Sequence, residues 1–298
     1  MRRKREGQAT ALMFLASFLW GSSFVGSKIC LNAGMFPLET VFYRMLISVI
    51  GIGILFHRDL RNWTPSALKA GLAAGVVTAA IYTAEMYGIR MIEPTAASFL
   101  TSTNIIMMPF LSALFLKNRL ERRSFLSAAI AMSGVALLTL TGTETISFSM
   151  GYLLLLLAAF GYAMSSIVVV KFGEGASPLQ ITFLQLLITM IYTGAMTLFQ
   201  GRGSNYPPQA IGALLYLAVG PTLICFLIKN YSLQYLSPLR CTMILSTEGI
   251  FCALLSIIIL HDHVTLRMLA GIILIVTGIL IESAMPHFHG RVRNTDGT

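Results

Sequence analysis

Charged residues are scarce in this chain. Only 11% of its 298 residues are Asp, Glu, Lys or Arg, and 56% are hydrophobic. A soluble domain carries roughly 25% charged residues. A soluble chain this apolar could not cover its surface with polar groups, so the composition predicts lipid as the surrounding solvent.

Other absences narrow the function classes. No GxxxxGK[ST] motif is present, so no ATP-driven pump is indicated within the chain. Aspartate occurs only at Asp59, Asp262 and Asp296, outside the deep apolar runs, which excludes membrane enzymes built on aspartate-rich metal sites. The four cysteines form no CxxC pair, which favours buried thiols over disulfides or a metal site. His261 and His263 flank Asp262, where a solvated turn is favoured over a metal site. No cofactor is expected.

Ten segments are long and apolar enough to cross a bilayer. A helix needs roughly 20 mostly apolar residues to span the hydrocarbon core, and a spanning backbone must satisfy its own hydrogen bonds. The basic start and the apolar run after it could be a cleaved signal peptide, but the run lacks a clear small-x-small cleavage site, so it is interpreted as the first span. The expected spans are 9–30, 37–56, 67–89, 95–116, 123–141, 150–170, 179–199, 210–230, 238–260 and 266–285.

Lys and Arg residues lie mostly on one side of these expected spans. With the N-terminus inside, 16 of the 21 fall in inside segments, 4 fall in outside segments, and Arg44 lies within a helix. Because inside connections are enriched in Lys and Arg, both termini are predicted to be cytoplasmic, in a multi-pass protein of the cell inner (plasma) membrane. The Lys and Arg residues behind the net charge of +9 are expected to face anionic lipid headgroups, and nucleic acid is not an expected partner.

The sequence repeats itself. Residues 36–42 (FPLETVF) match residues 177–183 (SPLQITF) at an offset of 141. Further along, the offset becomes 144. Apolar helices match easily by chance, so the shared prolines, Ser-Thr pairs and Arg are stronger evidence for a repeat than matches of Leu or Ile. At that offset the paired residues include Tyr87 with Tyr231, Pro94 with Pro238, Ser102-Thr103 with Ser246-Thr247, and Arg123 with Arg267.

Each repeat contains five expected helices, and an odd number places the second repeat upside down relative to the first. The charges agree, because residues 117–123 carry four Lys or Arg and their counterpart, residues 261–267, carries one. The prediction is an all-α integral membrane fold of ten transmembrane helices in two inverted five-helix repeats. Inverted repeats are typical of secondary transporters, and a duplicated scaffold without transport is the alternative. The predicted divisions are a basic N-terminus (1–8), two repeats (9–141 and 150–285) and a C-terminal tail (286–298).

Several short motifs resemble one transporter family. The stretch 18-FLWGSSFVGSK-28, followed by Pro37 and Arg44, and the stretches 246-STEGIFCALLSIIIL-260 and 271-GIILIVTGILI-281 resemble the EamA-like family of the drug/metabolite transporter superfamily. The resemblance covers residues 9–284. It implies a central cavity lined mainly by helices 1, 3, 4, 6, 8 and 9, and movement of small organic solutes. The Gly-Glu that the family often has after helices 4 and 9 is replaced here by Lys-Asn and His-Asp.

Four ionisable side chains are expected within the spans, where charge is costly and tends to mark function. Glu248 could bind a solute ammonium, take up a coupling proton, or be a structural partner for Arg44 or for a gap in the backbone hydrogen bonding. Glu85 is either functional or interfacial. Arg44 could clamp a carboxylate, but a structural pin between helices is slightly favoured, and Lys229 is interpreted as a snorkelling charge at a helix end. The repeat relates Glu85 to Lys229, Asn104 to Glu248, and Arg44 to Gln185.

Helix 4 is unusually polar for a span. Residues 101–104 read Thr-Ser-Thr-Asn, and Pro109 predicts a kink that frees backbone groups, so this helix is expected to line a cavity. Trp20, Tyr82 and Tyr162 could form an aromatic wall. The expected solute-binding residues are therefore Trp20, Arg44, Tyr82, Glu85, Thr103, Asn104, Tyr162 and Glu248.

The function that these features favour is a secondary transporter, an exporter of an amino acid or related metabolite, and not an enzyme. The expected partners are a small-molecule solute and the lipid bilayer. The alternatives are an exporter of drug-like or quaternary cations, a membrane-embedded enzyme, and a channel or non-transporting scaffold. A cavity lined by both Glu and Arg side chains would suit a zwitterionic solute.

Overall fold

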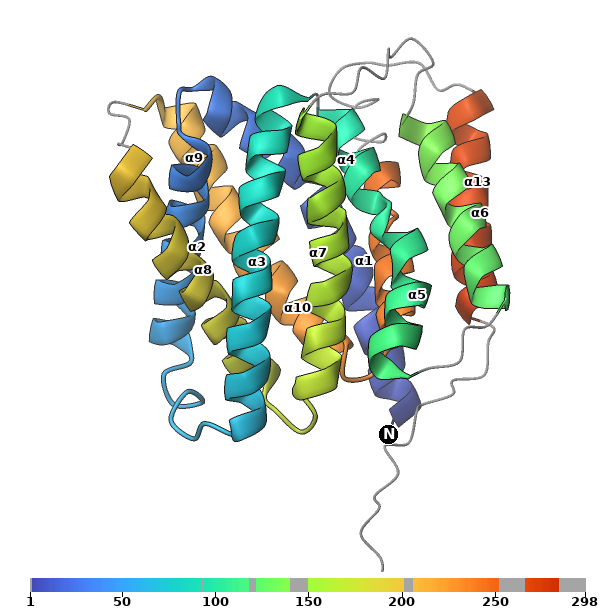
Figure 1. Ribbon diagram of the computed structural model, residues 1–298, viewed down its shortest axis with the longest axis horizontal. Helices are drawn as coiled ribbons and strands as arrows, with labels where there is room; N and C mark the ends of the chain where they lie inside the picture. The colour runs from blue at the N-terminus through green and yellow to red at the C-terminus, as the bar shows by residue number, and fades with distance from the viewer. Residues whose placement is uncertain are drawn as a thin grey trace, which may run out of the picture.

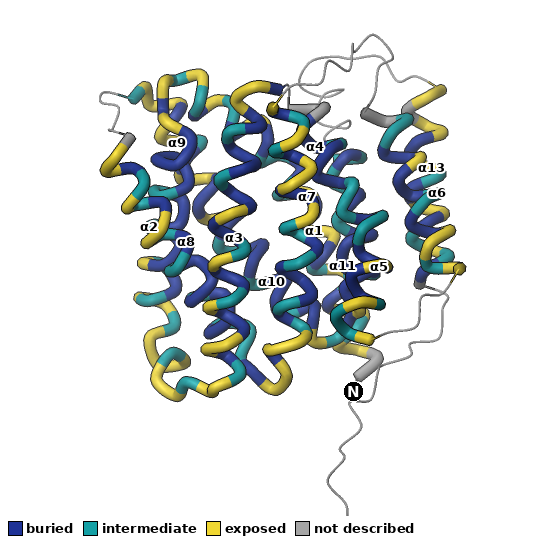
Figure 2. Tube along the Cα trace, viewed as in Figure 1, coloured by how far each residue is buried: buried dark blue, intermediate teal, exposed yellow. Residues whose placement is uncertain are grey.

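The protein is a bundle of long helices. The computed structural model describes residues 2–92, 94–117, 122–139, 150–200, 206–251 and 266–283, and all regular structure in these ranges is helical (Figure 1). Large apolar side chains such as Ile54, Leu114 and Leu198 are exposed on the outside of the bundle. Exposed apolar faces of this extent fit a protein whose outer surface meets lipid (Figure 2).

Six helices are described in the N-terminal part of the bundle. Proline occupies the first position of α2, α3 and α4, where its missing N–H costs no hydrogen bond. The Thr64 hydroxyl also caps α3 by accepting from the Ala67 N–H. The helices are α1 (Arg2–Asn32), α2 (Pro37–Leu55), α3 (Pro65–Met91), α4 (Pro94–Ser102), α5 (Asn104–Leu116) and α6 (Arg122–Thr139).

The C-terminal part begins with two long helices and then becomes more broken. One span is divided into α9, the π-helical segment η1, and α10, and the span that follows is interrupted after α11. The elements are α7 (Met150–Phe172), α8 (Pro178–Gln200), α9 (Pro208–Leu217), η1 (Ala218–Ile224), α10 (Cys225–Ser232), α11 (Pro238–Leu245) and α13 (Leu266–Ser283).

Seven helical segments in the described ranges are long and apolar enough to cross a membrane. They coincide with seven of the ten expected spans, those beginning at residues 9, 37, 67, 95, 150, 179 and 210. The other three expected spans correspond to α6, to α11 with residues 248–251, and to α13. Parts of the expected spans 123–141, 238–260 and 266–285 lie outside the described residues.

α1 and α3 each pack against several other helices of the bundle. In Figure 1, α6 and α13 pair at one edge, α2, α8 and α9 stand at the other, and α3 and α7 lie between them. α3 packs against both α7 and α8, and α1 packs against α9, α10 and α11. At the edge pair, a Cβ on Gly134 would lie 2.6 Å from the Gly271 carbonyl oxygen, so only glycine permits this approach of α6 to α13.

Two hydrogen bonds join the halves of the chain in equivalent ways. The Nε of Arg44 on α2 donates to the Thr222 Oγ1 of η1 at 3.2 Å. The Nε2 of Gln185 on α8 donates to the Thr78 Oγ1 of α3 at 2.7 Å. Gln185 follows Arg44 by 141 residues and Thr222 follows Thr78 by 144, the same offsets that the sequence repeat shows. In each half, the residue at the position of Arg44 or Gln185 therefore donates to the threonine at the equivalent position of the other half.

The fourth and eighth expected spans (95–116 and 210–230, called helices 4 and 8) are not the single continuous helices that the sequence predicts. Helix 4 is made of α4 and α5, and helix 8 of α9, η1 and α10. The kink expected at Pro109 is not where the helix is interrupted: α5 continues through that proline, and the break lies at Thr103. There the Thr103 Oγ1 donates to the Leu100 carbonyl at 2.6 Å, competing with the helical backbone. In helix 8, Pro221 cannot donate to the Leu217 carbonyl, and the Thr222 hydroxyl donates to it instead at 2.7 Å.

Candidate functional site

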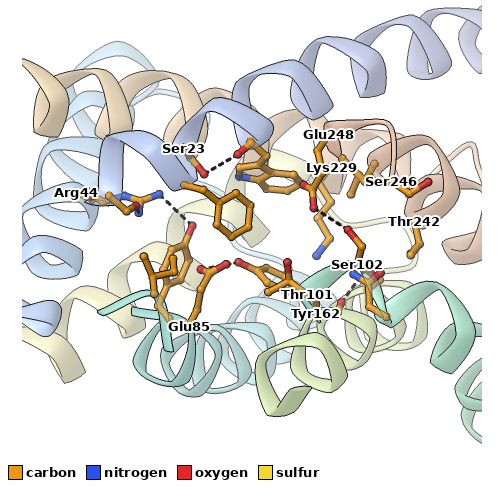
Figure 3. A pocket seen from close by; sticks show the side chains of 18 residues that line it. Ser23, Arg44, Glu85, Thr101, Ser102, Tyr162, Lys229, Thr242, Ser246 and Glu248 are labelled. Atoms are coloured by element: carbon orange, nitrogen blue, oxygen red, sulfur yellow. Dashed lines mark hydrogen bonds between the residues drawn. The ribbon is translucent and has the colours of Figure 1, made fainter. Parts of the chain in front are cut away.

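A small polar cavity lies at the centre of the bundle. Its volume is about 50 Å³, room for a few water molecules. The lining comes from α1, α2, α3, α4, α5, α7, α10 and α11 and from residues just after α11, which agrees with the helices that the family resemblance implies. The lining residues are Trp20, Ser23, Phe24, Ser27, Arg44, Tyr82, Glu85, Ile89, Thr101, Ser102, Asn104, Tyr162, Ser166, Lys229, Thr242, Leu245, Ser246 and Glu248 (Figure 3).

Aromatic rings form part of the cavity wall. The Trp20 Nε1 donates to the Pro221 carbonyl at 2.7 Å, so a residue of the π-helical segment fixes the indole of α1. The Trp20 ring meets Phe226 edge-on at a centroid distance of 5.7 Å, and Phe226 also contacts the Tyr82 ring at 6.2 Å. Trp20, Tyr82 and Tyr162 all line the cavity, as the expected aromatic wall requires.

Glu85 lies on the wall formed by α3. Its side chain is 6% exposed, and its Oε2 accepts a hydrogen bond from the Tyr162 hydroxyl of α7 at 2.9 Å. Its side chain therefore lines the cavity and is not exposed on the outer surface of the bundle. Buried carboxylates need hydrogen-bond donors, and here the donor is itself a cavity residue.

Glu248 lies where two interrupted helices meet. α4 ends at Ser102, and α11 is followed by a turn at residues 246–247, directly before Glu248. The Ser102 Oγ donates to the Glu248 Oε1 at 3.2 Å and joins the two interruptions. A Cβ on Gly21 would lie 2.7 Å from the Glu248 carbonyl oxygen, so glycine at that position lets α1 pass directly against the backbone that carries this carboxylate.

Arg44 contacts three helical segments. It is 2% exposed, and its nitrogens donate to Thr222 of η1 at 3.2 Å, Ser27 of α1 at 3.5 Å and the Tyr82 hydroxyl of α3 at 3.4 Å. Its guanidinium carbon also lies 5.0 Å from the centroid of the Tyr82 ring. All these partners are neutral side chains of the protein, an arrangement that fits the structural pin better than an open carboxylate clamp.

Lys229 is not the snorkelling charge that the sequence suggested. Its side chain is 3% exposed and lines the cavity, with Nζ 3.5 Å from the Ser165 Oγ and 6.0 Å from the centroid of the Tyr162 ring. The hydropathy boundary of helix 8 placed it near a membrane surface. Its repeat relation to Glu85, 144 residues earlier, was the signal that placed it at cavity depth.

Seven of the eight expected solute-binding residues line the cavity, and Thr103 does not. The Thr103 hydroxyl is used within its own helix break, whereas the adjacent Ser102 faces Glu248. Sequence reasoning missed the hydroxyl residues of α1, α7 and α11, because isolated Ser and Thr are common in membrane helices. The lining residues on these elements that were not predicted include Ser23, Ser27, Ser166, Thr242 and Ser246.

The cavity chemistry suits binding of a small polar molecule. It carries two carboxylates and two cationic side chains together with several hydroxyls. Within the described residues, no group of three His, Cys, Asp or Glu side chains could hold a metal ion. The candidate metal ligands His261, Asp262 and His263 lie outside the described residues.

A helical membrane bundle with a polar cavity between its halves defines a class of multi-pass membrane proteins, and comparison with known proteins identifies the family. The model of the EamA-like transporter family matches residues 8–140 and again residues 149–283. The chain belongs to the EamA-like transporter family, and it is a membrane transporter by that membership.

Similar proteins carry the same general description. An uncharacterized transporter of Archaeoglobus fulgidus is 25% identical over 269 residues, covering 90% of this chain and 83% of its own. The uncharacterized transporter YdfC of Bacillus subtilis is 25% identical over 291 residues, covering 93% of this chain and 91% of its own. A crystal structure that is 15% identical superposes with a TM-score of 0.78 over 94% of this chain and 99% of that one, which shows a shared fold.

Proposed function

We propose that this protein is a secondary active transporter that exports a small organic solute, such as an amino acid or related metabolite. The observation that carries the proposal is the central cavity, where Glu85 and Glu248 share an enclosed space with Lys229 and Arg44. Ionisable groups at this depth are costly and mark solute or ion pathways. A cavity with both signs of charge suits a zwitterion.

The transport cycle proposed is alternating access between two inverted five-helix repeats. Three observations support this arrangement: the two family matches, the equivalent Arg44 and Gln185 hydrogen bonds, and one further pair. The Ser48 Oγ on α2 donates to the Ala218 carbonyl at 2.7 Å, and Thr189, 141 residues later on α8, donates to the Gly75 carbonyl at 3.3 Å. The donors are at the repeat offset, and the two acceptors are 143 residues apart, one short of it. Halves with matching cross-contacts can rock against each other around a central site.

The sidedness proposed follows from charge. The excess of Lys and Arg in inside connections supports cytoplasmic termini in the plasma membrane, and the superfamily resemblance supports export as the direction. A proton could be the coupling ion, with Glu248 as the group that takes it up. Its Oε1 accepts from the Ser102 hydroxyl and its side chain lines the cavity, so a proton could reach it with the solute.

A second candidate function is export of drug-like or quaternary cations. The aromatic wall beside the two carboxylates favours it, because ring faces attract cations and carboxylates neutralise them. Cationic solutes without an anionic group would then compete with zwitterions. The two candidates differ in whether the solute needs a negative charge.

Counterflow in proteoliposomes tests the proposed function. Purified protein is preloaded with unlabelled solute, and uptake of labelled amino acids, quaternary cations and neutral sugars is followed with time. Saturable exchange of one class supports transport, and the class separates the two candidates. The Glu248→Gln variant should lose most of this exchange, whereas Glu174→Gln, an exposed loop carboxylate, should keep it. An absence of exchange for every class would contradict the proposal.

A further inference from the structure

Lys229 is a buried cation with few partners. Among the described residues its Nζ has one long hydrogen bond, 3.5 Å to the Ser165 Oγ, although an ammonium carries three donors. Within the described residues no carboxylate lies within ion-pair distance of it. A buried unpaired charge is costly, so a side chain held in this way is suited to meet an anion that the protein does not itself supply. Figure 3 shows the ammonium directed into the space shared with Tyr162 and Glu248.

Arg44 is in a different situation, although it also borders the cavity. Each of its three nitrogens donates to a neutral oxygen on another helical segment, and the Tyr82 ring lies against the guanidinium. To receive a ligand carboxylate, the guanidinium would have to release contacts that join α1, α2, α3 and η1. In Figure 3 the Arg44 side chain lies at the edge of the group of side chains that line the cavity, away from Lys229 and Glu248.

Within the part of the chain that the structure describes, each of the two cavity carboxylates has one neutral donor. The Tyr162 hydroxyl donates to Glu85 at 2.9 Å, and Ser102 donates to Glu248 at 3.2 Å. Neither donor carries charge, so neither carboxylate is committed to an ion pair with its donor, and both remain placed to face a cationic group. The central part of the cavity thus presents two carboxylates and one cation, and that cation is Lys229.

We propose that Lys229, rather than Arg44, binds the anionic group of the solute and makes the site selective for molecules that carry one. Glu85 and Glu248 face the cationic group of the same molecule. The inference rests on the proposed function, because it names the residue that selects the transported solute. It also gives a role to the repeat asymmetry, in which one half places a carboxylate, Glu85, where the other places an ammonium.

Equilibrium binding tests this assignment without requiring transport. Purified full-length protein is titrated by calorimetry with L-leucine, L-serine, L-phenylalanine and L-lysine, and with their carboxamides, which keep the ammonium but lack the carboxylate. A charge-assisted hydrogen bond corresponds to about ten- to hundredfold in affinity. We expect the protein to prefer an acid to its amide by at least about tenfold, and Lys229→Met to remove that preference while amide affinity stays within about twofold.

Matched variants distinguish the loss of the Lys229 charge from a general disturbance of the fold. Lys229→Arg should keep the preference, and Lys171→Met, at the exposed end of α7, should leave all affinities unchanged. Equal wild-type affinity for acids and amides, or binding of neither, would overturn the proposal. So would loss of the preference in Arg44→Gln but not in Lys229→Met. Loss of amide binding in both Lys229→Met and Lys229→Gln would also overturn it. Normal acid selectivity without counterflow of the bound solute would instead overturn the proposed transport function alone.

Discussion

If Arg44 is a structural pin, replacing it should weaken the bundle without abolishing solute recognition. In Arg44→Met the side chain keeps much of its length and loses every donor. Contacts to α1, α3 and η1 disappear together, since three donated bonds and the ring contact belong to one guanidinium. We therefore expect a lower free energy of unfolding and an unchanged preference for acids over amides.

The expected loss in free energy of unfolding follows from the three hydrogen bonds of Arg44 and its contact with the Tyr82 ring. Side-chain hydrogen bonds in membrane proteins average about 0.6 kcal/mol, so three bonds of 3.2 to 3.5 Å contribute about 2 kcal/mol together. A cation–π contact adds about 0.5–2 kcal/mol, and removal of a buried charge recovers part of its desolvation cost. The net expectation is a loss of about 2–3 kcal/mol.

Unfolding in mixed micelles of increasing denaturing-detergent content measures this loss. The reporter is the rate at which a maleimide reacts with the buried cysteines, such as Cys225. Gln185→Met is the matched control, because Gln185 makes the equivalent cross-half bond without a charge, and it should cost about 1–2 kcal/mol. An Arg44→Met protein as stable as the wild type, or one that is stable but has lost acid selectivity, would refute the pin.

Three further predictions concern the cavity. Glu248→Gln should weaken binding of amino acid amides about tenfold or more, because their ammonium loses a charged partner; calorimetry measures the change. Tyr162→Phe should lower the affinity for the same amides about two- to tenfold, because it removes the hydroxyl that holds Glu85. Gly21→Ala should reduce solute affinity by forcing α1 away from the Glu248 backbone, whereas Gly212→Ala, with open space around it, should not.

Each of these has a contradicting result. Unchanged amide affinity in Glu248→Gln would remove that carboxylate from the cation-binding group. A Tyr162→Phe protein that binds as tightly as the wild type would show that its hydroxyl does not orient Glu85. Equal affinities for the Gly21→Ala and Gly212→Ala proteins, measured side by side, would show that the close approach of α1 does not position the site.

The sequence predicted the helices and most of the cavity because both depend on strong signals. Long apolar runs place the spans, and rare deep charges such as Glu85 and Glu248 stand out against them. The membrane character of the fold and the family membership are confirmed. The ten-span inverted arrangement stays a prediction, since parts of helices 5, 9 and 10 lie outside the described residues.

What the sequence did not predict depends on local competition between hydrogen bonds. Whether Ser102 or Thr103 faces the cavity is decided by which hydroxyl bonds to its own backbone, and both choices fit the same polar run. Lys229 was misplaced because hydropathy measures depth only coarsely, and a long side chain near a helix end can point either way. The repeat offset resolves that choice, because it relates Lys229 to Glu85.

The wide turns of η1 also set the rotational phase of the helix that follows. An α-helix turns about 100° per residue, so deleting one residue within Ala218–Ile224 and restoring regular pairing would rotate α10 by about that angle relative to α9. Lys229 would then leave the cavity, and Asn230 would leave Gln185. The π-helical segment around Pro221 thus shifts the rotational phase of the span that runs from α9 to α10. Both α9 and α10 pack against α1, and the shifted α10 also directs the Lys229 ammonium into the cavity.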